Sequence, residues 1–401
     1  MVILFFFSMP KKVDIVIGLG FGDEGKGLTT DFLVKRSKKP IVVRFNGGHQ
    51  AGHTVTTKDG FSHIFSHFGS GTLRKTPSYW SKYCTFSPAY LLYEYDTLPN
   101  KPKIFIDNSC PVTTHYDVLY NRCLENSRGQ NRLGSCGVGF GATIQRHVEN
   151  GIILRIEDLF SIKALKQKLK IIRNYYASKF LKEIDLTFDS FQHDEEDKRF
   201  IEYIEEIKKL KDSGIIYFVQ ASDVFENSEW ESFIFEGAQG ILLDRDYGNK
   251  PFITQSNSTS KNAFEIISNF KNIKFDIDLY YVSRAYLTRH GGGPFHEFPL
   301  SYELKGAINE TNINNEFQGI FRKGFLNIDL MNYALACDAI YSGSHKKSLV
   351  ITCIDHLPSS DIYYIKGSEI CSKPYNSLIS ELSVSFNRVF FSLSPCAEDL
   401  A

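Results

Sequence analysis

The segment Gly-Leu-Gly-Phe-Gly-Asp-Glu-Gly-Lys-Gly at residues 18–27 combines a glycine-rich backbone with charged side chains. Glycines let the chain turn so that backbone N–H groups point together at an anion, and Lys26 adds a positive charge. The spacing matches most of a phosphate-binding loop, but Gly27 stands where a hydroxyl usually ligates magnesium. Asp23 is the oxygen donor that could replace it, and its carboxylate could also act as a base. We therefore predict a site for Mg²⁺ and phosphate.

Two other interpretations of this segment are weaker. The pattern Gly20-x-Gly22-x-x-Gly25 also fits a dinucleotide-binding fingerprint, yet the second apolar run ends at Asn46, where a ribose-binding acid would be expected. A tight surface turn would explain Gly-Asp-Glu-Gly, but it would not explain the lysine or the strand and helix expected on either side.

A second group of polar side chains follows an apolar run in residues 44–54, Arg-Phe-Asn-Gly-Gly-His-Gln-Ala-Gly-His-Thr. If that run is a neighbouring parallel strand, His49, Gln50, His53 and Thr54 lie beside the first loop, because parallel strands end at the same edge of a sheet. An imidazole next to a phosphate site can donate to developing negative charge. The residue types of the two segments therefore suit phosphoryl transfer, with His53 as the donor.

The apolar pattern predicts the elements that position these loops. We expect strands at residues 13–18, 41–45, 103–106, 215–219, 233–235, 279–285, 349–354 and 389–393, and helices at 29–36, 164–181 and 195–210. Strands alternating with helices indicate an α/β fold, a large and mostly parallel central sheet flanked by helices, with the site at its carboxyl edge. No repeat or linker divides the chain. We expect a disordered leader over residues 1–12, with Met9 as the true start, and a single domain over residues 13–401.

The composition narrows the class of protein further. The 46 basic and 46 acidic side chains balance, so no overall field recruits a nucleic acid polymer or a membrane surface. The apolar opening of the chain is too short to span a bilayer. Eight cysteines lie far apart without a Cys-x-x-Cys pair, which is typical of reduced thiols in a cytoplasmic protein.

The two glycine-rich segments together resemble the adenylosuccinate synthetase family, whose hallmark pair is a Gly-Asp-Glu-Gly-Lys-Gly loop followed by Gly-Gly-x-x-Ala-Gly-His-Thr. The resemblance continues over most of the chain, through residues 70–74, 87–89, 235–240, 242–244, 288–295 and 315–317. It implies a GTP-dependent ligase that joins L-aspartate to IMP through a 6-phosphoryl-IMP intermediate, with Mg²⁺ as cofactor. It also implies a homodimer.

The resemblance assigns roles to individual residues. The catalytic residues would be Asp23, His53 and Gln239, and the metal ligands Asp23 and Gly52. Asp355 would read guanine, because a carboxylate accepts hydrogen bonds from the N1 and N2 hydrogens of that base. The residues implied for GTP are Gly22, Asp23, Glu24, Gly25, Lys26, Gly27, Gly52, His53, Thr54, Cys353, Asp355, Ser392 and Ser394. Those implied for IMP are Asp23, Lys26, Gln50, His53, Cys136, Gln239 and Thr254.

The chain departs from the family pattern around two of the substrates. The arginine-rich aspartate loop is shortened to residues 318–324, which leaves Arg322 as the expected aspartate ligand. Cys136 stands where a threonine would touch the IMP phosphate. The partner-subunit arginine that reaches that phosphate aligns near Glu149, with Arg146 as a possible substitute. Cys353 replaces a lysine beside the guanine reader.

These departures leave three hypotheses. The first is GTP-dependent ligation of aspartate to IMP. The second keeps the chemistry on a different purine nucleotide such as dGMP, as in the phage branch, although that branch carries serine where this chain has Asp23. The third is a non-catalytic nucleotide-binding paralogue, against which the retained Asp23, Lys26, His53 and Gln239 argue.

Overall fold

The computed structural model describes residues 9–184, 192–295, 300, 302–305 and 317–401. A nine-stranded sheet forms the centre of this described part, in the order β16-β13-β9-β1-β8-β2-β5-β6-β7, and every neighbouring pair is parallel. The predicted α/β class and parallel sheet are therefore confirmed. The strands are β1 (Lys11–Gly18), β2 (Pro40–Arg44), β5 (Ser78–Trp80), β6 (Ile104–Asp107), β7 (Ile216–Val219), β8 (Ser232–Gly240), β9 (Phe275–Arg284), β13 (Lys346–Thr352) and β16 (Arg388–Phe391).

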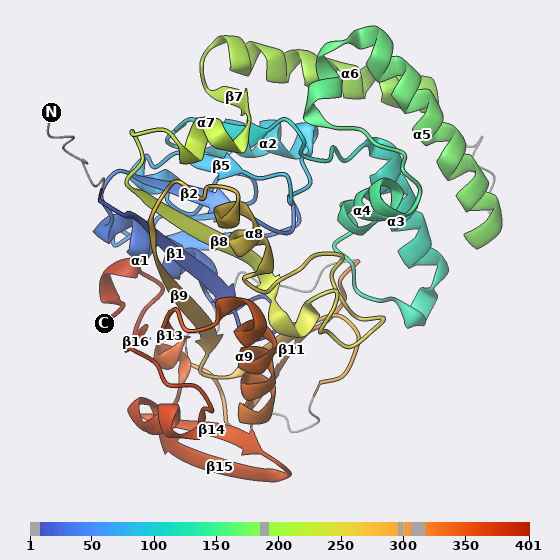
Figure 1. Cartoon of the computed structure of the whole chain (residues 1–401). Helices are drawn as coiled ribbons and strands as arrows, with labels where there is room; N and C mark the ends of the chain where they lie inside the picture. Colours follow the sequence, from blue (N-terminus) through green and yellow to red (C-terminus); the bar gives the residue numbers. More distant parts are fainter. Residues whose placement is uncertain (1–8, 185–191, 296–299, 301, 306–316) are drawn as a thin grey trace, which may run out of the picture.

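Alternate side chains of β1 pack into two different cores because successive residues of a strand point to opposite faces. Val13, Ile15 and Ile17 join the core under α7 (Ala221–Phe225), α8 (Lys261–Ser268) and α9 (Ile328–Ser342). Val16 faces the other way and packs with the apolar residues of α1 (Lys26–Arg36). The strand that precedes the glycine-rich loop is thus buried on both faces (Figure 1).

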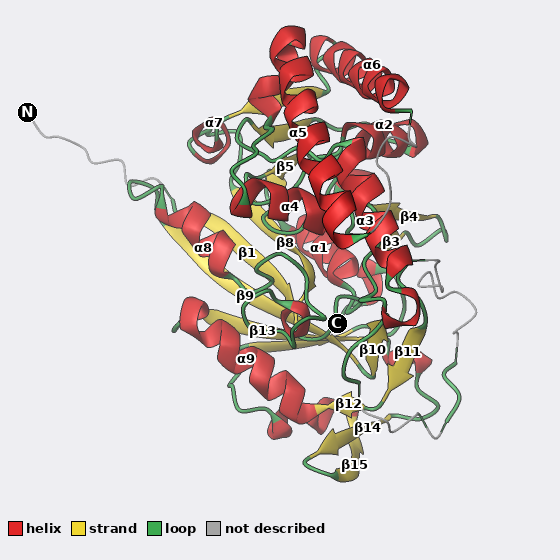
Figure 2. Cartoon of the chain, turned by 90° about the vertical axis from the view of Figure 1, so that its right-hand side faces the viewer, coloured by secondary structure: helices red, strands yellow, loops and turns green. Residues whose placement is uncertain are grey.

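A third core surrounds the strands at the far edge of the sheet. It is built with α2 (Pro88–Thr97), α3 (His115–Ser127), α4 (Phe140–Glu149), α5 (Ile162–Glu183) and α6 (His193–Asp212). Figure 2 shows α2 to α6 grouped on one side of the molecule, away from α9 and the hairpin of β14 (Asp361–Lys366) and β15 (Glu369–Pro374). The predicted helices at residues 29–36, 164–181 and 195–210 are confirmed as α1, α5 and α6.

Small sheets and short 3-10 helices complete the described chain. The small sheets pair β3 (His53–Thr56) with β4 (Ser62–Phe65), β10 (Leu287–His290) with β11 (Phe321–Gly324), and β14 (Asp361–Lys366) with β12 (Leu326–Asn327) and β15 (Glu369–Pro374). The 3-10 helices are Thr72–Arg74, Gly129–Asn131, Ile156–Phe160, Ile241–Leu243, Ile354–His356, Tyr375–Glu381 and Ala397–Asp399.

Several strand boundaries differ from the expectation: β8 runs on to Gly240, and β9 and β13 begin earlier, at Phe275 and Lys346. β1 begins at Lys11 rather than at residue 13, so the last two residues of the expected leader are strand, and residues 1–8 lie outside the described part. Lys12 can belong to this strand because its ammonium pairs with Asp278 of β9 at 2.8 Å. β5 was not expected, since only three residues of it are paired and they carry a serine and two aromatic residues.

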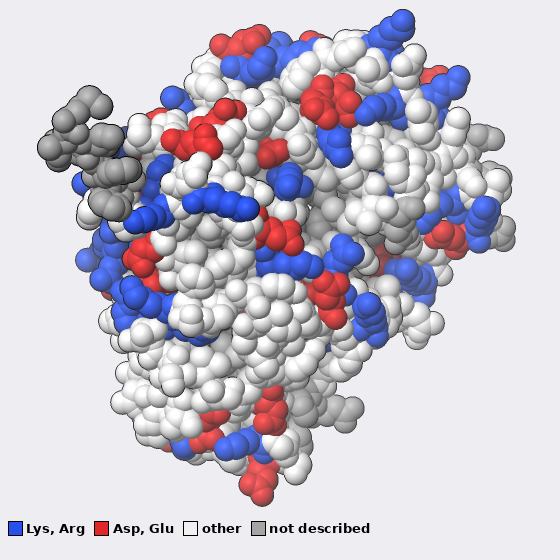
Figure 3. Space-filling view, in the orientation of Figure 1, with Lys and Arg blue, Asp and Glu red and all other residues white. Residues whose placement is uncertain are grey.

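The surface agrees with the balanced composition. Basic and acidic side chains are interspersed over the face in Figure 3, without a field of one sign. Among the described residues, no helix combines the length and apolar character needed to cross a bilayer.

The amino end of the sheet holds a pair of buried carboxylates with a testable pH dependence. Asp14 and Asp278 are register partners on β1 and β9, with exposed fractions of 5% and 2%. Burial, opposed by Lys12 and reinforced by Asp278, raises the pKa of Asp14 to about 6. The native state therefore holds this proton more tightly than the unfolded chain, and stability falls as pH rises from the ordinary aspartate pKa of about 4 through 6.

We expect deprotonation of Asp14 to lower the free energy of unfolding by up to about 3 kcal/mol as pH rises from about 4 to above 6. Asp14→Asn should remove that part of the pH dependence. Urea unfolding of both proteins, below pH 4 and above pH 7, measures it. Equal pH dependence in the two proteins would show that the Asp14 pKa is not raised.

Candidate functional site

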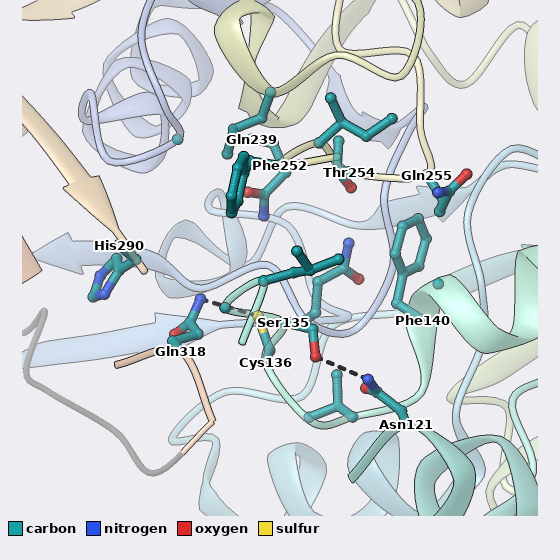
Figure 4. Close-up of a pocket in the computed structure, with 18 of the residues that line it drawn as sticks. Asn121, Ser135, Cys136, Phe140, Gln239, Phe252, Thr254, Gln255, His290 and Gln318 are labelled. Atoms are coloured by element: carbon teal, nitrogen blue, oxygen red, sulfur yellow. Dashed lines mark hydrogen bonds between the residues drawn. The ribbon is translucent and has the colours of Figure 1, made fainter. Parts of the chain in front are cut away.

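The loops at the carboxyl edge of the sheet enclose a cavity of about 500 Å³. Eight of the residues predicted for the site line it: Gly22, Asp23, Gln50, Gly52, His53, Cys136, Gln239 and Thr254. Figure 4 shows Gln239, Phe252 and Thr254 on one side of this cavity and Asn121, Ser135 and Cys136 on the other. Asp23 and His53 thus share one cavity, although they come from loops after different strands.

Glu24 organises the glycine-rich loop from inside. Its carboxylate accepts hydrogen bonds from the N–H groups of Gly20 at 2.9 Å and Gly22 at 2.8 Å. The Lys26 ammonium lies 2.5 Å from the same carboxylate and donates to the Gly22 carbonyl at 2.9 Å. Both charged side chains are buried, and neither lines the cavity. The amides of Gly20 and Gly22 and the lysine are therefore satisfied internally in this conformation.

The loop is packed so closely that a methyl group at Gly240 should displace it. A Cβ there would lie 2.1 Å from the Gly20 carbonyl oxygen and 2.5 Å from Glu24 Oε1. The first contact is with backbone, so the loop itself must move. We expect Gly240→Ala to lower kcat/KM by about 10²-fold, the effect of a displacement near 1 Å on a catalytic arrangement.

Steady-state kinetics and calorimetric titration with the nucleotide measure this effect. Gly60→Ala is the control, because it strains a positive φ in open space away from the site. Equal activity losses in both variants would mean that general destabilisation, and not loop displacement, is responsible.

Asp23 is held by its backbone and surrounded by positive charge. Arg284 donates to the Asp23 carbonyl oxygen, and His290 Nε2 lies 3.7 Å from Asp23 Oδ2. Burial raises the pKa of Asp23, although Arg284 and His290 oppose the rise. A raised pKa makes a carboxylate a stronger base, which suits proton abstraction.

His53 begins β3 and is fixed by a buried carboxylate. Glu236 Oε1 lies 2.7 Å from His53 Nδ1, and the side-chain exposures are 0% for Glu236 and 5% for His53. Burial lowers the pKa of His53, although the charge of Glu236 acts in the opposite direction. Because Nδ1 faces Glu236, Nε2 is the nitrogen left for a ligand in the cavity.

Two amide side chains give the cavity unsatisfied polar groups. Both amide atoms of Gln50 are buried and lack a hydrogen-bond partner among the described residues. Gln239 takes a left-handed conformation with φ of 62°, which is costly for a residue other than glycine and is typical of functional sites. Asn46, by contrast, bonds both backbone groups of Ala238 and so holds the loop that carries Gln239.

The residues predicted to read guanine lie beside the loop but do not line the cavity. Thr352, the last residue of β13, donates through Oγ1 to the Glu24 carbonyl at 2.7 Å. Cys353 follows with a positive φ of 60° and leads to Asp355.

Ser392 lies beside the segment that carries Asp355, because the Ile354 N–H donates to the Ser392 carbonyl at 3.3 Å. Ser394 accepts the Ser392 hydroxyl at its carbonyl oxygen. The four predicted residues therefore form one group next to the glycine-rich loop.

The arginine expected at the aspartate site is directed elsewhere in this conformation. Arg322 donates to the carbonyls of Gly291 at 2.6 Å and Gly293 at 3.1 Å and does not line the cavity. Its register partner Arg289 does line it and stacks on Phe21 at 4.3 Å. Burial, and then the charge of Arg322, lowers the pKa of Arg289 to about 10. Neither arginine has an acidic partner among the described residues.

Arg146 does not provide the phosphate contact considered for it. The guanidinium is fully buried and donates to Asp117 at 2.8 Å, to Ile152 O at 2.7 Å and to Val112 O at 3.0 Å. An arginine enclosed within its own chain cannot reach the site of another subunit. That expectation is wrong because an acid on α3, remote in sequence, captures the side chain.

Asp23 and Gly52, the residues expected to hold magnesium, line the same cavity. A carboxylate and a backbone carbonyl suit Mg²⁺, which prefers a few oxygen ligands while keeping waters or phosphate oxygens. No cluster of three or more His, Cys, Asp or Glu residues that could hold a metal exists within the described residues. The protein would therefore hold the ion together with its nucleotide rather than in a closed cage.

The fold and the cavity define an α/β protein of the class that places a glycine-rich anion loop at the carboxyl edge of a parallel sheet. The family model for adenylosuccinate synthetase matches residues 15–388. The adenylosuccinate synthetase of Flavobacterium psychrophilum is 30% identical over 378 residues, covering 91% of this chain and 85% of that protein. The Pasteurella multocida enzyme is 32% identical over 295 residues, 72% of this chain and 65% of its own. The chain belongs to the adenylosuccinate synthetase family.

Two solved structures share the fold. The fully ligated adenylosuccinate synthetase of Plasmodium falciparum superposes with a TM-score of 0.74 and 18% identity, covering 97% of this chain and 99% of that one. The succinoaminodeoxyadenylate synthetase (PurZ) of cyanophage S-2L, bound to dGMP and dATP, superposes with a TM-score of 0.65 and 14% identity. The match covers 98% of this chain and 95% of that one.

Four residues near the reacting groups were not assigned a role from the sequence: Glu236, Arg284, Arg289 and His290. Three of them, Glu236, Arg289 and His290, lie in segments 235–240 and 288–295, which belong to the resemblance. Membership of these segments is the sequence signal that points to them. Arg284 ends β9, and its contact with Asp23 depends on the parallel pairing of β1 with β9.

Proposed function

We propose that this protein is a GTP-dependent ligase that forms adenylosuccinate from IMP and L-aspartate through a 6-phosphoryl-IMP intermediate. The observation that carries the proposal is that Asp23, His53 and Gln239 line one cavity beside the glycine-rich loop. The unpartnered Gln50 amide in the same cavity supports a polar ligand there.

The side chains divide the chemistry between them. Asp23 takes the N1 proton of IMP, so that O6 attacks the γ-phosphorus of GTP and GDP leaves. His53 donates to the oxygens of the transferring phosphoryl group through Nε2. The aspartate amine then attacks C6 and phosphate departs, which replaces one difficult step with two easier ones. Gln239 and Thr254 orient the purine nucleotide. Mg²⁺, held by Asp23 and Gly52, neutralises phosphate charge when it is bound.

GTP, the phosphoryl donor, would bind along the glycine-rich loop, with its base toward Asp355. The Glu24 backbone contacts Thr352, and Asp355 with Ser392 and Ser394 follows at the strand ends. Phosphate binding by Lys26 requires the ammonium to exchange Glu24 for a phosphate oxygen, since the two side chains are paired at 2.5 Å.

The amine donor would enter beside Arg289 and Arg322. Two neighbouring guanidinium groups without acidic partners in the described structure attract a dicarboxylate. A homodimer and a cytoplasmic location are further inferences from the family, and analytical ultracentrifugation tests the first.

A second candidate is the same ligation on another purine nucleotide such as dGMP. The structural similarity to PurZ, which was solved with dGMP, supports it. Asp23 favours IMP over dGMP, because the phage branch carries serine at this position.

One assay separates these functions. Purified protein is incubated with Mg²⁺, aspartate and either GTP or ATP, together with IMP or dGMP, and phosphate release and product mass are recorded. We expect adenylosuccinate only with IMP and GTP. Product from dGMP would establish the second candidate, and absence of phosphate release in every arm would identify a non-catalytic paralogue.

A further inference from the structure

Glu236 is an ionisable group in the centre of the sheet that the proposed chemistry does not use. It lies on β8 between Val16 of β1 and Arg44 of β2 in register, and its side chain has an exposure of 0%. A carboxylate buried among apolar strands costs several kcal/mol unless its partners compensate for it. Such a residue in a core needs a physical reason.

The partners of Glu236 come from the loops that surround the cavity. Ser70 donates to the carboxylate through its hydroxyl and, at 3.2 Å, through its N–H. Arg44 Nε lies at 3.9 Å, and His53 Nδ1 at 2.7 Å is the ionisable partner that also lines the cavity.

The position of the Glu236 carboxylate selects the tautomer of His53, because its Oε1 lies 2.7 Å from Nδ1. Burial alone would raise the pKa of Glu236, but His53, Arg44 and Ser70 overcome this and lower it to about 2. The contact between Nδ1 and Glu236 is close, at 2.7 Å, but it is not aligned as a hydrogen bond. An ionised carboxylate can only accept, so Nδ1, the ring nitrogen held against it, is the one on which a proton is stabilised. Nε2 then faces the cavity.

We propose that Glu236 is a positioning residue, which sets the ring orientation and tautomer of His53 so that Nε2 is presented to the transferring group. The catalytic role of His53 in this inference rests on the proposed function, whereas its pairing with Glu236 does not. Carboxylates hold histidines in this way at many metal and catalytic sites, where their loss typically costs about 10- to 100-fold.

A double-mutant cycle tests whether Glu236 acts through His53. We expect Glu236→Gln to lower kcat by about 10- to 100-fold with a much smaller change in the KM for IMP. In a His53→Ala background the same substitution should have almost no further effect, because the group that it positions is gone. Multiplicative losses in the double variant would show that Glu236 is only structural.

Glu94→Gln is the matched control. Glu94 is also a buried carboxylate, with an exposed fraction of 5%, and it accepts the N–H groups of Ser66, His67 and Phe68 without lining the cavity. Its loss should lower the free energy of unfolding but leave kcat within about twofold, as expected for a residue remote from the reacting atoms. A kcat loss equal to that of Glu236→Gln would overturn the proposal.

Nitrogen NMR separates this inference from the proposed function. Long-range ¹H–¹⁵N spectra of protein labelled at histidine, assigned with a His53→Gln variant, report which ring nitrogen carries the proton. We expect a proton on Nδ1 of His53 in the parent protein and a changed pattern in Glu236→Gln. A neutral His53 protonated only at Nε2 would refute the positioning role even if the ligase is active. A proton on Nδ1 in a protein that fails to turn over IMP would leave the pairing intact and remove the ligase.

Discussion

Asp23→Asn should reduce turnover by about 10³-fold, within the range expected for loss of a general base. The amide keeps the shape of the side chain but cannot take the N1 proton of the purine, and it is a poorer magnesium ligand. The raised pKa of Asp23, caused by its burial, makes the loss of basicity larger than it would be on the surface.

The affected step can be measured directly. Exchange of the β–γ bridging oxygen of labelled GTP in the presence of IMP, without aspartate, reports phosphoryl transfer alone. Asp23→Asn should abolish this exchange, whereas Asp14→Asn, in the middle of β1 and outside the cavity lining, should retain it. Full exchange in Asp23→Asn would remove Asp23 as the base.

His53→Ala should lower kcat by about 10²- to 10³-fold, as does removal of other donors that face developing charge. Binding of IMP should change much less, because Gln50, Gln239 and Thr254 remain in the cavity. Exchange of labelled GTP oxygen should fall together with kcat. His345→Ala provides the control, since this exposed histidine stacks on Phe264 and does not line the cavity. Unchanged exchange in His53→Ala would assign the histidine to substrate binding instead.

The sequence predicts the sheet well because its central strands are apolar on both faces. Residues 13–18, 41–45 and 349–354 stand out for this reason. The last residue of each predicted run lies within two residues of the end of β1, β2 or β13. The short β5 and α9, whose apolar residues are spread around the helix, lack a clear period and were not predicted.

The site could be predicted only as far as the motifs extend. The glycine-rich loop and the His53 segment share a cavity because parallel strands end together. The pairing of His53 with Glu236 joins residues far apart in the chain, and only the register of β8 with β2 brings them together. Likewise, local spacing gives no sign that Asp117 encloses Arg146 or that Lys26 pairs with Glu24.

The order of the sheet has a consequence for synthesis of the chain. β1, which leads into the glycine-rich loop, has β8 and β9 as its two neighbours, and these begin at Ser232 and Phe275. While the ribosome is still making the first half of the protein, β1 has neither of its neighbouring strands, and the face that packs under α7, α8 and α9 lacks those helices. Such distant pairing slows folding and exposes the nascent chain to aggregation. Chaperone contact during translation should therefore persist until β9 has left the exit tunnel.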